Sequence, residues 1–177
     1  MSCNLAAGIT LGCRDNAGGV NKVWITDYEN ILSITKNSGD TITSISGASG
    51  STFYSFELIR TTSELTETVN ASLENGTVFY TQELTMFFAK LEQYKRNIIK
   101  TLAQSFRLAV IFEDNNGSYF LLGEEYGMFV SAGSNVTGLA LGDRQGYNLT
   151  LQALEQLPMN ELNAPIASVV TGMTVQS

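Results

Sequence analysis

Hydrophobic and polar residues alternate along most of this chain, which is the pattern of β-strands that bury one face. Glycine, asparagine and aspartate cluster between the alternating segments, where they predict tight turns. Residues 52–60 differ, because aromatic side chains occupy both alternations, and this predicts a strand covered on both faces. The other expected strands are residues 23–26, 31–35, 41–45, 63–73, 77–81, 108–113, 119–123, 127–132 and 147–154.

A long hairpin is expected in the middle of the chain. Asn75 and Gly76 stand between the expected strands 63–73 and 77–81. Asn-Gly is a strong signal for a type I′ turn, in which both central residues have positive φ. We therefore expect Asn75 and Gly76 at the tip of a protruding ribbon, where they contact a neighbouring subunit.

One long α-helix is expected over residues 86–105, after the hairpin. Thr85 is the expected N-cap, although the boundary between strand and helix could fall anywhere from residue 81 to residue 88. The apolar stripe recurs at steps of three and four residues and is expected to face a sheet. It consists of Phe87, Phe88, Leu91, Tyr94, Ile98, Leu102 and Phe106.

No linker long enough to separate two domains interrupts the 177 residues, so residues 1–177 are expected to form a single domain. Roughly residues 1–20 are rich in glycine and small side chains and are expected to form an N-terminal arm or a first edge strand. Residues 157–177 are expected to form a C-terminal tail that becomes β-like over residues 167–175. With a single helix among many strands, the expected fold class is mainly β (α+β).

The chain lacks the residues that most often carry out catalysis or bind metals. It contains no histidine, and its two cysteines, Cys3 and Cys13, are expected to be reduced thiols packed as small apolar groups. No phosphate-binding loop, nucleophile elbow or Cys-x-x-Cys motif is present. We therefore expect no enzymatic activity, no cofactor and no metal site.

Four carboxylates lie at the ends of expected hairpins: Glu113, Asp114, Glu124 and Glu125. A carboxylate pair at a fixed separation is what glycoside hydrolysis requires, but no spacing in the sequence fixes such a separation. We expect these groups to be exposed charge.

No segment approaches the ~20 apolar residues that span a membrane, and no basic segment precedes the N-terminal apolar residues. The expectation is a cytoplasmic protein without membrane contact.

The charge is distributed unevenly. Residues 85–107 carry five basic side chains and one acidic side chain, Glu92, so their net charge is +4. Because the whole chain has a net charge of −7, the other residues together carry −11. Lys90, Arg96 and Lys100 fall on the polar face of the expected helix. We expect this face to meet the acidic surface of another copy; the alternative is a solvated helix face. Binding to DNA is disfavoured by the acidic remainder.

The order of elements resembles a known family. Strands, a glycine-rich loop, a long hairpin, one helix and further strands are the layout of the tail tube proteins of tailed bacteriophages. Related tube proteins of type VI secretion systems and contractile injection machines share this layout. Residues 11–20 (LGCRDNAGGV) and 112–123 (FEDNNGSYFLLG) also resemble virion structural proteins of phages that infect gut anaerobes, crAss-like phages among them.

The resemblance implies an antiparallel β-sandwich or barrel with one long helix. It implies hexameric rings, joined sheet to sheet around a central channel and stacked through loops, arms and the hairpin. The partners would be further copies and other virion tail or neck proteins, with DNA only in transit through the channel. The location would be the virion tail, assembled in the host cytoplasm.

Two other functions stay open on the sequence. Within the same class, the chain could form a single ring of a head–tail connector, a neck or a tail terminator. In a different class, it could be a β-sandwich module that binds a receptor or decorates a capsid. No loop set concentrates exposed aromatic residues, which weakens the second alternative.

Overall fold

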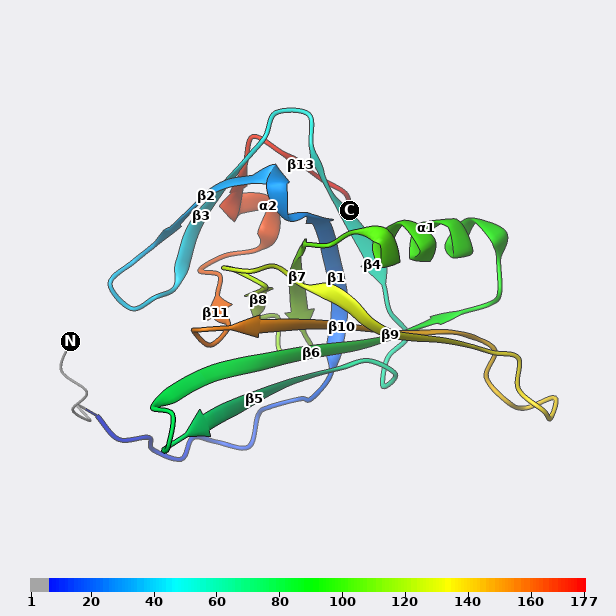
Figure 1. Ribbon diagram of the computed structural model, residues 1–177, viewed down its shortest axis with the longest axis horizontal. Helices are drawn as coiled ribbons and strands as arrows, with labels where there is room; N and C mark the ends of the chain where they lie inside the picture. The colour runs from blue at the N-terminus through cyan, green and yellow to red at the C-terminus, as the bar shows by residue number, and fades with distance from the viewer. Residues whose placement is uncertain (1–6) are drawn as a thin grey trace.

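The computed structural model describes residues 7–177, in which β-strands predominate (Figure 1). The first strands are β1 (Val20–Asp27), β2 (Ile31–Lys36), β3 (Ile42–Gly47) and β4 (Thr52–Glu57). The central elements are β5 (Glu64–Ser72), β6 (Thr77–Ala89), α1 (Gln93–Gln104), β7 (Leu108–Asp114) and β8 (Tyr119–Leu122). The last elements are β9 (Phe129–Val136), β10 (Gly146–Glu155), β11 (Asn160–Glu161), α2 (Ile166–Val169), β12 (Val170–Thr171) and β13 (Thr174–Val175).

The strands form three sheets. The largest has the order β11-β8-β7-β1-β4-β13, the second has the order β5-β6-β10-β9, and the third has the order β12-β3-β2. Most neighbouring strands are antiparallel, but β12 pairs with β3 and β13 pairs with β4 in parallel. The C-terminal strands therefore return to sheets that the N-terminal half of the chain begins.

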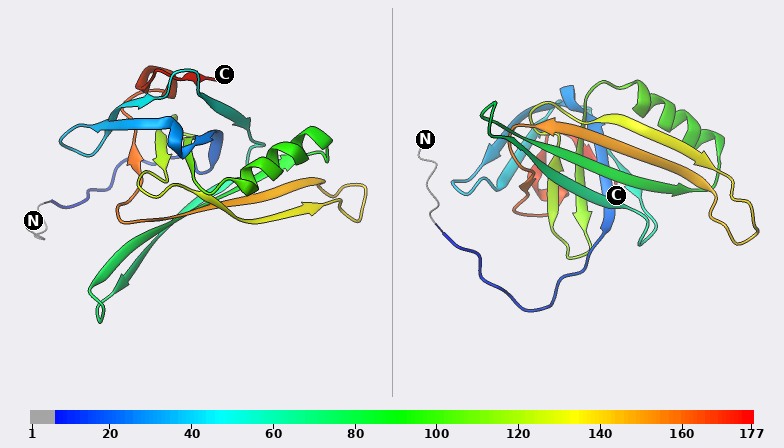
Figure 2. Two further views of the ribbon diagram at one scale, coloured as in Figure 1. Left: turned by 45° about the horizontal axis from the view of Figure 1, so that its top comes forward. Right: turned by 60° about the horizontal axis from the view of Figure 1, so that its bottom comes forward.

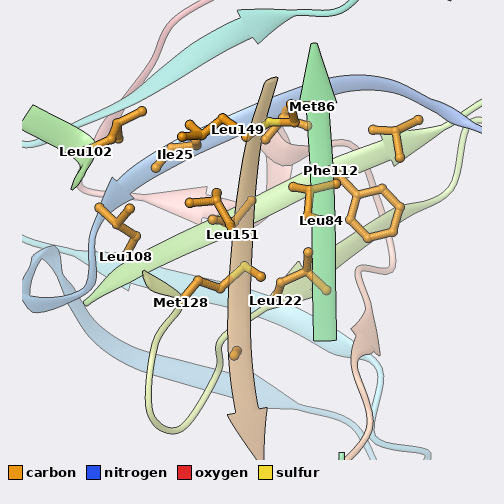
Figure 3. Close-up of a cluster of buried hydrophobic side chains, with 14 residues drawn as sticks. Ile25, Leu84, Met86, Leu102, Leu108, Phe112, Leu122, Met128, Leu149 and Leu151 are labelled. Carbon is orange, nitrogen blue, oxygen red and sulfur yellow. The ribbon is translucent and has the colours of Figure 1, made fainter. Parts of the chain in front are cut away.

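One face of the six-stranded sheet packs against the four-stranded sheet. Figure 3 shows Leu84 and Met86 of β6 and Leu149 and Leu151 of β10 in one cluster with Ile25 of β1. Leu84 lies opposite Leu151 in the β6–β10 register, so cross-strand pairs build this core. The cluster also contains Val20, Val23, Leu102, Leu108, Val110, Phe112, Leu122, Met128 and Ala153.

The other face of the six-stranded sheet covers a second core. Trp24, Phe53, Ile111 and Leu121 point into it from the strands of this sheet. The far side is supplied by β3 and the C-terminal segment, through Ile42, Ile45, Leu162, Ile166, Val169 and Val170. The six-stranded sheet is therefore the middle layer. This position explains why the first five residues of β7 are all buried and apolar.

Each expected strand is present, and most bounds agree within a few residues. The C-terminal segment is more than a tail, because Leu162, Ile166 and Val169 are buried in the second core. α2 occupies residues 167–169 of the expected β-like stretch, and β12 and β13 form only after it. The sequence did not reveal this because its apolar residues are spaced without a clear period around Pro158 and Pro165.

The helix is shorter than the sequence indicates. α1 begins at Gln93, and residues 86–89 continue β6 instead. Thr85, the expected N-cap, lies in the middle of the four-stranded sheet, where its Oγ1 is 3.3 Å from that of Thr150. The prediction was wrong because adjacent aromatic residues at 87 and 88 satisfy the spacing of a helix as well as that of a strand. The N-cap residue is Glu92, whose side chain makes no capping hydrogen bond.

The apolar stripe of the helix is only partly covered. Leu102 is the buried residue of α1, whereas Tyr94 is 60% exposed and Ile98 is 40% exposed. Phe106, beyond the end of α1, is 92% exposed. α1 contacts β9, the outer strand of the four-stranded sheet. A helix placed along a sheet edge buries a narrower stripe than one placed across a sheet face, so the expected full contact with a sheet is wrong.

The turn of the long hairpin also differs. β5 ends at Ser72 and β6 begins at Thr77, so four residues form the loop. Gly76 has a φ of 61°, but Asn75 is not among the residues with positive φ, which excludes a type I′ turn. The backbone N–H of Asn75 donates instead to Oγ of Ser72 over 3.3 Å. The hairpin itself is confirmed.

The N-terminal arm extends from the body of the protein (Figure 2). Residues 7–19 are exposed and precede β1 without forming a strand or helix. Cys13 lies on this arm and is exposed, so the expectation that it packs as a small apolar group is wrong. Cys3 lies outside the described residues.

Candidate assembly surfaces

The four-stranded sheet carries a polar face opposite its core face. Leu84 and Met86 point inward, so Glu83 and Thr85 between them point outward, and Thr66 lies opposite Glu83 in the register. Thr66 and Glu83 are exposed. No lysine or arginine occurs in any of the four strands of this sheet. The residues of the four strands therefore make this face neutral to acidic; the guanidinium of Arg144, from the β9–β10 loop, lies 4.8 Å from the ring of Phe87 beside them.

Each outer strand of this sheet, β5 and β9, is hydrogen-bonded to a neighbouring strand on one side only. Among the residues that the structure describes, β5 pairs with β6 alone and β9 pairs with β10 alone. β5 has nine residues and β9 has eight. Outer strands of this length leave a row of backbone donors and acceptors that a further strand can bind, although α1 contacts part of β9.

The hairpin of β5 and β6 projects beyond the rest of the sheet (Figure 2). Asn75 and Gly76 are exposed at its tip, as expected. The exposed apolar side chains near them are Val69, Leu73, Val78 and Phe79, with exposures of 60%, 100%, 55% and 41%. An isolated apolar residue on a surface is ordinary, but four on one ribbon indicate a contact surface.

The three basic residues singled out from the sequence lie near α1. Arg96 and Lys100 are exposed on the helix, as expected. Lys90 precedes the helix, has a φ of 67° and donates its backbone N–H to the carbonyl of Gln145 over 3.0 Å. Figure 1 shows α1 and the tip of the β5–β6 hairpin at opposite ends of the protein. One copy therefore does not bring the hairpin tip and the basic residues together.

The other two basic side chains of this segment have partners. Lys95 forms an ion pair with Glu92 at 2.9 Å and donates to the carbonyl of Ala89. Arg107 donates through Nε to the carbonyl of Tyr126 over 2.8 Å. Lys90, Arg96 and Lys100 form no ion pair within residues 7–177. Their charge is available to a partner.

A groove separates α1 from β4. Tyr54 and Phe56 of β4 line it on one side, and Tyr94 and Ile98 of α1 line it on the other. Its volume is about 980 Å³. Leu102 and Ile25 close its floor against the first core.

A buried carboxylate that the sequence analysis did not single out holds the turn between β8 and β9. Glu155 is 2% exposed, and its two carboxylate oxygens accept hydrogen bonds from the backbone N–H groups of Glu125 and Tyr126, over 2.9 and 3.0 Å. Burial raises the pKa of Glu155, and the two N–H donors partly oppose this rise. The signal was present in the sequence, since Glu155 continues the inward register of Leu151 and Ala153.

The backbone carbonyl groups of the same turn also accept hydrogen bonds from side chains. The hydroxyl of Tyr28 lies 2.9 Å from the carbonyl oxygens of Glu124 and Glu125. The guanidinium of Arg107 stacks on the ring of Tyr28 at 3.8 Å and donates through Nη2 to the carbonyl of Glu125. The polar groups of this cluster are directed at the backbone, which indicates a structural role.

The four hairpin carboxylates have separate surroundings. Glu113 accepts from Asn21, and Asp114 accepts from the backbone of its own turn. Glu124 is not simply exposed charge, because it forms an ion pair of 2.6 Å with Lys36. In residues 7–177 no three histidine, cysteine, aspartate or glutamate side chains are close enough to hold one metal ion. Within the same residues, neither helix has the length and apolar character needed to cross a membrane.

The surfaces that remain are the outer strands β5 and β9, the polar sheet face, the hairpin tip, the basic residues near α1 and the groove. Comparison with known proteins finds no family model, no curated protein and no solved structure that matches this chain.

Proposed function

We propose that this protein is a structural subunit of a bacteriophage tail tube, which assembles with further copies into stacked rings around a channel for DNA. The observation that carries the proposal is the four-stranded sheet: within residues 7–177 each of its outer strands is paired on one side only, and its four strands contain no lysine or arginine. The ring is hexameric by the family resemblance. Its place is the virion tail, built in the host cytoplasm, and the role needs no catalytic residue.

Pairing of β5 from one copy with β9 from the next joins the sheets of a ring. Each junction then satisfies backbone groups that an outer strand leaves open. A closed ring uses both outer strands of every copy, so no unpaired edge of this sheet is left. Closure is the general way in which β-proteins remove such edges.

The outward face of the sheet suits the wall of a DNA channel. Double-stranded DNA carries about one negative charge per 1.7 Å of its axis, and lysine and arginine bind it through those charges. Glu64 and Glu83 are both exposed, and no basic side chain from the four strands offsets them. This face presents mainly threonine, asparagine, glutamine and glutamate side chains, with the exposed Phe79 and Phe129 among them and Arg144 of the β9–β10 loop over Phe87. A wall with so few cations lets DNA pass without holding it.

Three projections supply contacts between subunits or rings. The first is the hairpin tip, and the second is the arm, on which Ile9 and Leu11 are fully exposed. The third is the loop between β9 and β10, where Leu139 and Leu141 are also fully exposed. Apolar side chains on projecting segments are favourable once a second copy covers them.

The alternative within the same class is a single ring of a connector, a neck or a tail terminator. The open edges of β5 and β9 support this alternative equally. A tail tube and a single ring differ in whether the rings stack. A virion binding or decoration module is the alternative from another class. It is favoured by one observation, the groove with the half-exposed aromatic side chains Tyr54 and Tyr94.

Negative-stain electron microscopy of the purified protein tests the proposal. Stacked rings or tubes with a central hole are expected. Single rings that never stack would favour the connector or terminator, and dispersed monomers at tens of micromolar would favour the binding module. The Glu83→Lys variant, which places a cation on the sheet face, is expected to assemble but to retain DNA at low salt.

A further inference from the structure

The two ends of the four-stranded sheet are far apart and are both marked by loops. β6 runs the length of the sheet: Thr77 adjoins the hairpin loop, residues 73–76, and Ala89 lies opposite Gly146, where the β9–β10 loop, residues 137–145, rejoins the sheet. At about 3.3 Å per residue, the 13 residues of β6 span roughly 40 Å. The hairpin tip and the β9–β10 loop therefore lie at opposite ends of one copy, as Figure 1 shows.

The β9–β10 loop is ordered by its own polar groups. One carboxylate oxygen of Asp143 accepts hydrogen bonds of 2.8 Å from the backbone N–H groups of both Leu139 and Ala140. The carbonyl of Gln145 accepts a hydrogen bond of 3.0 Å from the backbone N–H of Lys90, which ties the loop to the segment after β6. The loop therefore has a defined shape and not only a defined attachment.

The apolar side chains of this loop are uncovered. Leu139 is 100% exposed and Leu141 is 110% exposed, although both belong to the ordered turn that Asp143 holds. A single leucine on a surface is ordinary, but an ordered loop that keeps two leucines in water indicates a surface that another molecule covers.

The hairpin end of the sheet also presents apolar side chains. Leu73 is fully exposed in the hairpin loop. Val78 lies opposite Ala71 in the register, so Val69, Ala71 and Val78 share one face of the ribbon, and all three are exposed. Each end of the sheet thus has apolar surface that gains from contact with a second copy.

The charges at the two ends are opposite. Residues 61–89, which contain the whole hairpin, have four glutamates and no lysine or arginine, a net charge of −4. Of these glutamates, Glu74 is exposed at the tip. The loop end carries Lys90 and Arg144, which are exposed and form no ion pair within residues 7–177. Complementary charges favour contact of unlike ends and disfavour contact of like ends.

We propose that the hairpin tip of one copy packs against the β9–β10 loop of a second copy, with Leu73 on Leu139 and Leu141. Glu74 of the first copy then lies beside Arg144 of the second. The partner is a further copy of this chain, and the contact is head to tail, because it joins two different surfaces.

This inference rests on the proposed function and names the projections that meet when rings stack. In a ring closed through β5 and β9, the strands follow one another around the circumference, so each strand runs between the two faces of the ring. The hairpin tip then leaves one face and the β9–β10 loop leaves the other. Every copy in a ring repeats the contact, so contacts that are weak singly act together.

Disulfide trapping tests the contact in a background without the native thiols of Cys3 and Cys13, both replaced by serine. One chain carries Leu73→Cys, and the other carries Leu139→Cys or Leu141→Cys and a different tag. Mild oxidation of the mixed chains is expected to give a covalent dimer that bears both tags. A disulfide joins Cα atoms within ~7 Å of each other, so the length of β6 excludes the same link within one copy.

The matched control for trapping is Leu73→Cys with Ser38→Cys, at an exposed position in the β2–β3 turn. At least about tenfold less product is expected from this pair. A single chain with both Leu73→Cys and Leu141→Cys is expected to give a ladder of covalent multimers, because each copy then offers both ends of the contact.

A charge exchange tests the ionic part of the contact. Glu74→Arg and Arg144→Glu are each expected to weaken stacking at least about tenfold and to leave lateral association unchanged. The chain with both substitutions should stack as the wild type does, because unlike charges meet again. Glu29→Arg, at an exposed position between β1 and β2, is the matched control and should stack normally. Sedimentation velocity measures the association, and electron microscopy shows whether rings stack.

Two results would overturn the inference. One is that neither loop cysteine links to Leu73→Cys above the control, and the other is that the doubly exchanged chain stacks no better than the two single variants. Electron microscopy of the same samples separates the two proposals. Tubes without the link refute the contact between hairpin and loop alone, and linked copies that never close into rings refute the tail tube alone.

Discussion

A carboxylate oxygen of Glu155 accepts a hydrogen bond of 3.0 Å from the backbone N–H of Tyr126. Its other oxygen binds the N–H of Glu125, so one buried side chain at the end of β10 fixes the turn that leads into β9. β9 is one of the two outer strands through which the rings are proposed to close. The position of that edge therefore depends on a carboxylate inside the protein.

Replacement of Glu155 by glutamine is expected to change how stability depends on pH. Burial raises the native pKa above the ordinary value of 4.5, so the native state holds this proton more tightly than the unfolded chain. The free energy of unfolding of the wild type should then fall as the pH rises upward from about 4.5. Glutamine has no proton to lose, so the advantage of the wild type over Glu155→Gln should shrink over the same interval.

Urea unfolding at a series of pH values measures this difference. Glu161→Gln, the same change at an exposed position, is the matched control. A constant difference between wild type and Glu155→Gln across the pH series would contradict the assignment of a raised native pKa.

Core substitutions should separate the real core from the one expected on the helix. Leu151 is fully buried, and Leu151→Ala should lower the free energy of unfolding by ~2–5 kcal/mol. Ile98 is 40% exposed, and Ile98→Ala should cost less than about 1 kcal/mol in the monomer. Chemical denaturation of both variants provides the comparison, and equal losses would be inconsistent with the half-open groove.

The hairpin turn offers a pair of adjacent substitutions. Gly76 has a φ of 61°, which a β-branched residue adopts only with strain, so Gly76→Val should destabilise the tip by ~1–2 kcal/mol. Asn75→Val should cost less, because Asn75 is not among the residues with positive φ. Thermal unfolding of the two variants decides the turn type, and equal losses would restore the type I′ turn indicated by the sequence.

Charge reversal tests the basic residues near α1. The Arg96→Glu/Lys100→Glu variant should remain folded, because both side chains are exposed, but should associate at least about tenfold more weakly, or ~1.4 kcal/mol. High salt should weaken wild-type association in the same direction. Sedimentation velocity with circular dichroism gives both readings, and Arg60→Glu, at an exposed position, is the charge-reversal control for Lys100→Glu alone. Unaltered association of the α1 variant would identify a solvated surface.

The strands could be predicted from the sequence because the alternation of apolar and polar residues is a local property of each segment. The bounds of β5 follow from its own residues, and so do those of β10. The start of α1 could not be predicted, since Phe87 and Phe88 fit the spacing of a helix and that of a strand, and only pairing with β10 keeps them in a strand. Long-range contact overrides local preference at such positions.

The surfaces were predicted less completely than the strands. Asn75, Gly76, Arg96 and Lys100 are exposed where the sequence placed them. The cluster around Glu155 joins the end of β10 with Tyr28, which follows β1, and Arg107, which precedes β7, and no local pattern in the sequence indicates that these residues meet. The role of the C-terminal segment was missed for the same reason, because its apolar residues are buried by strands that are distant in the sequence, from β1 to β8.

Backbone hydrogen exchange of the assembled protein tests the central claim most directly, namely that β5 and β9 join neighbouring copies. Peptides that cover β5 and β9 should exchange at least tenfold more slowly in assemblies than in dissociated subunits. Peptides from β6 and β10, which are paired in every copy, should be protected in both states. Assemblies in which β5 and β9 exchange as fast as in the free subunit, or a protein that stays monomeric at tens of micromolar, would contradict the account.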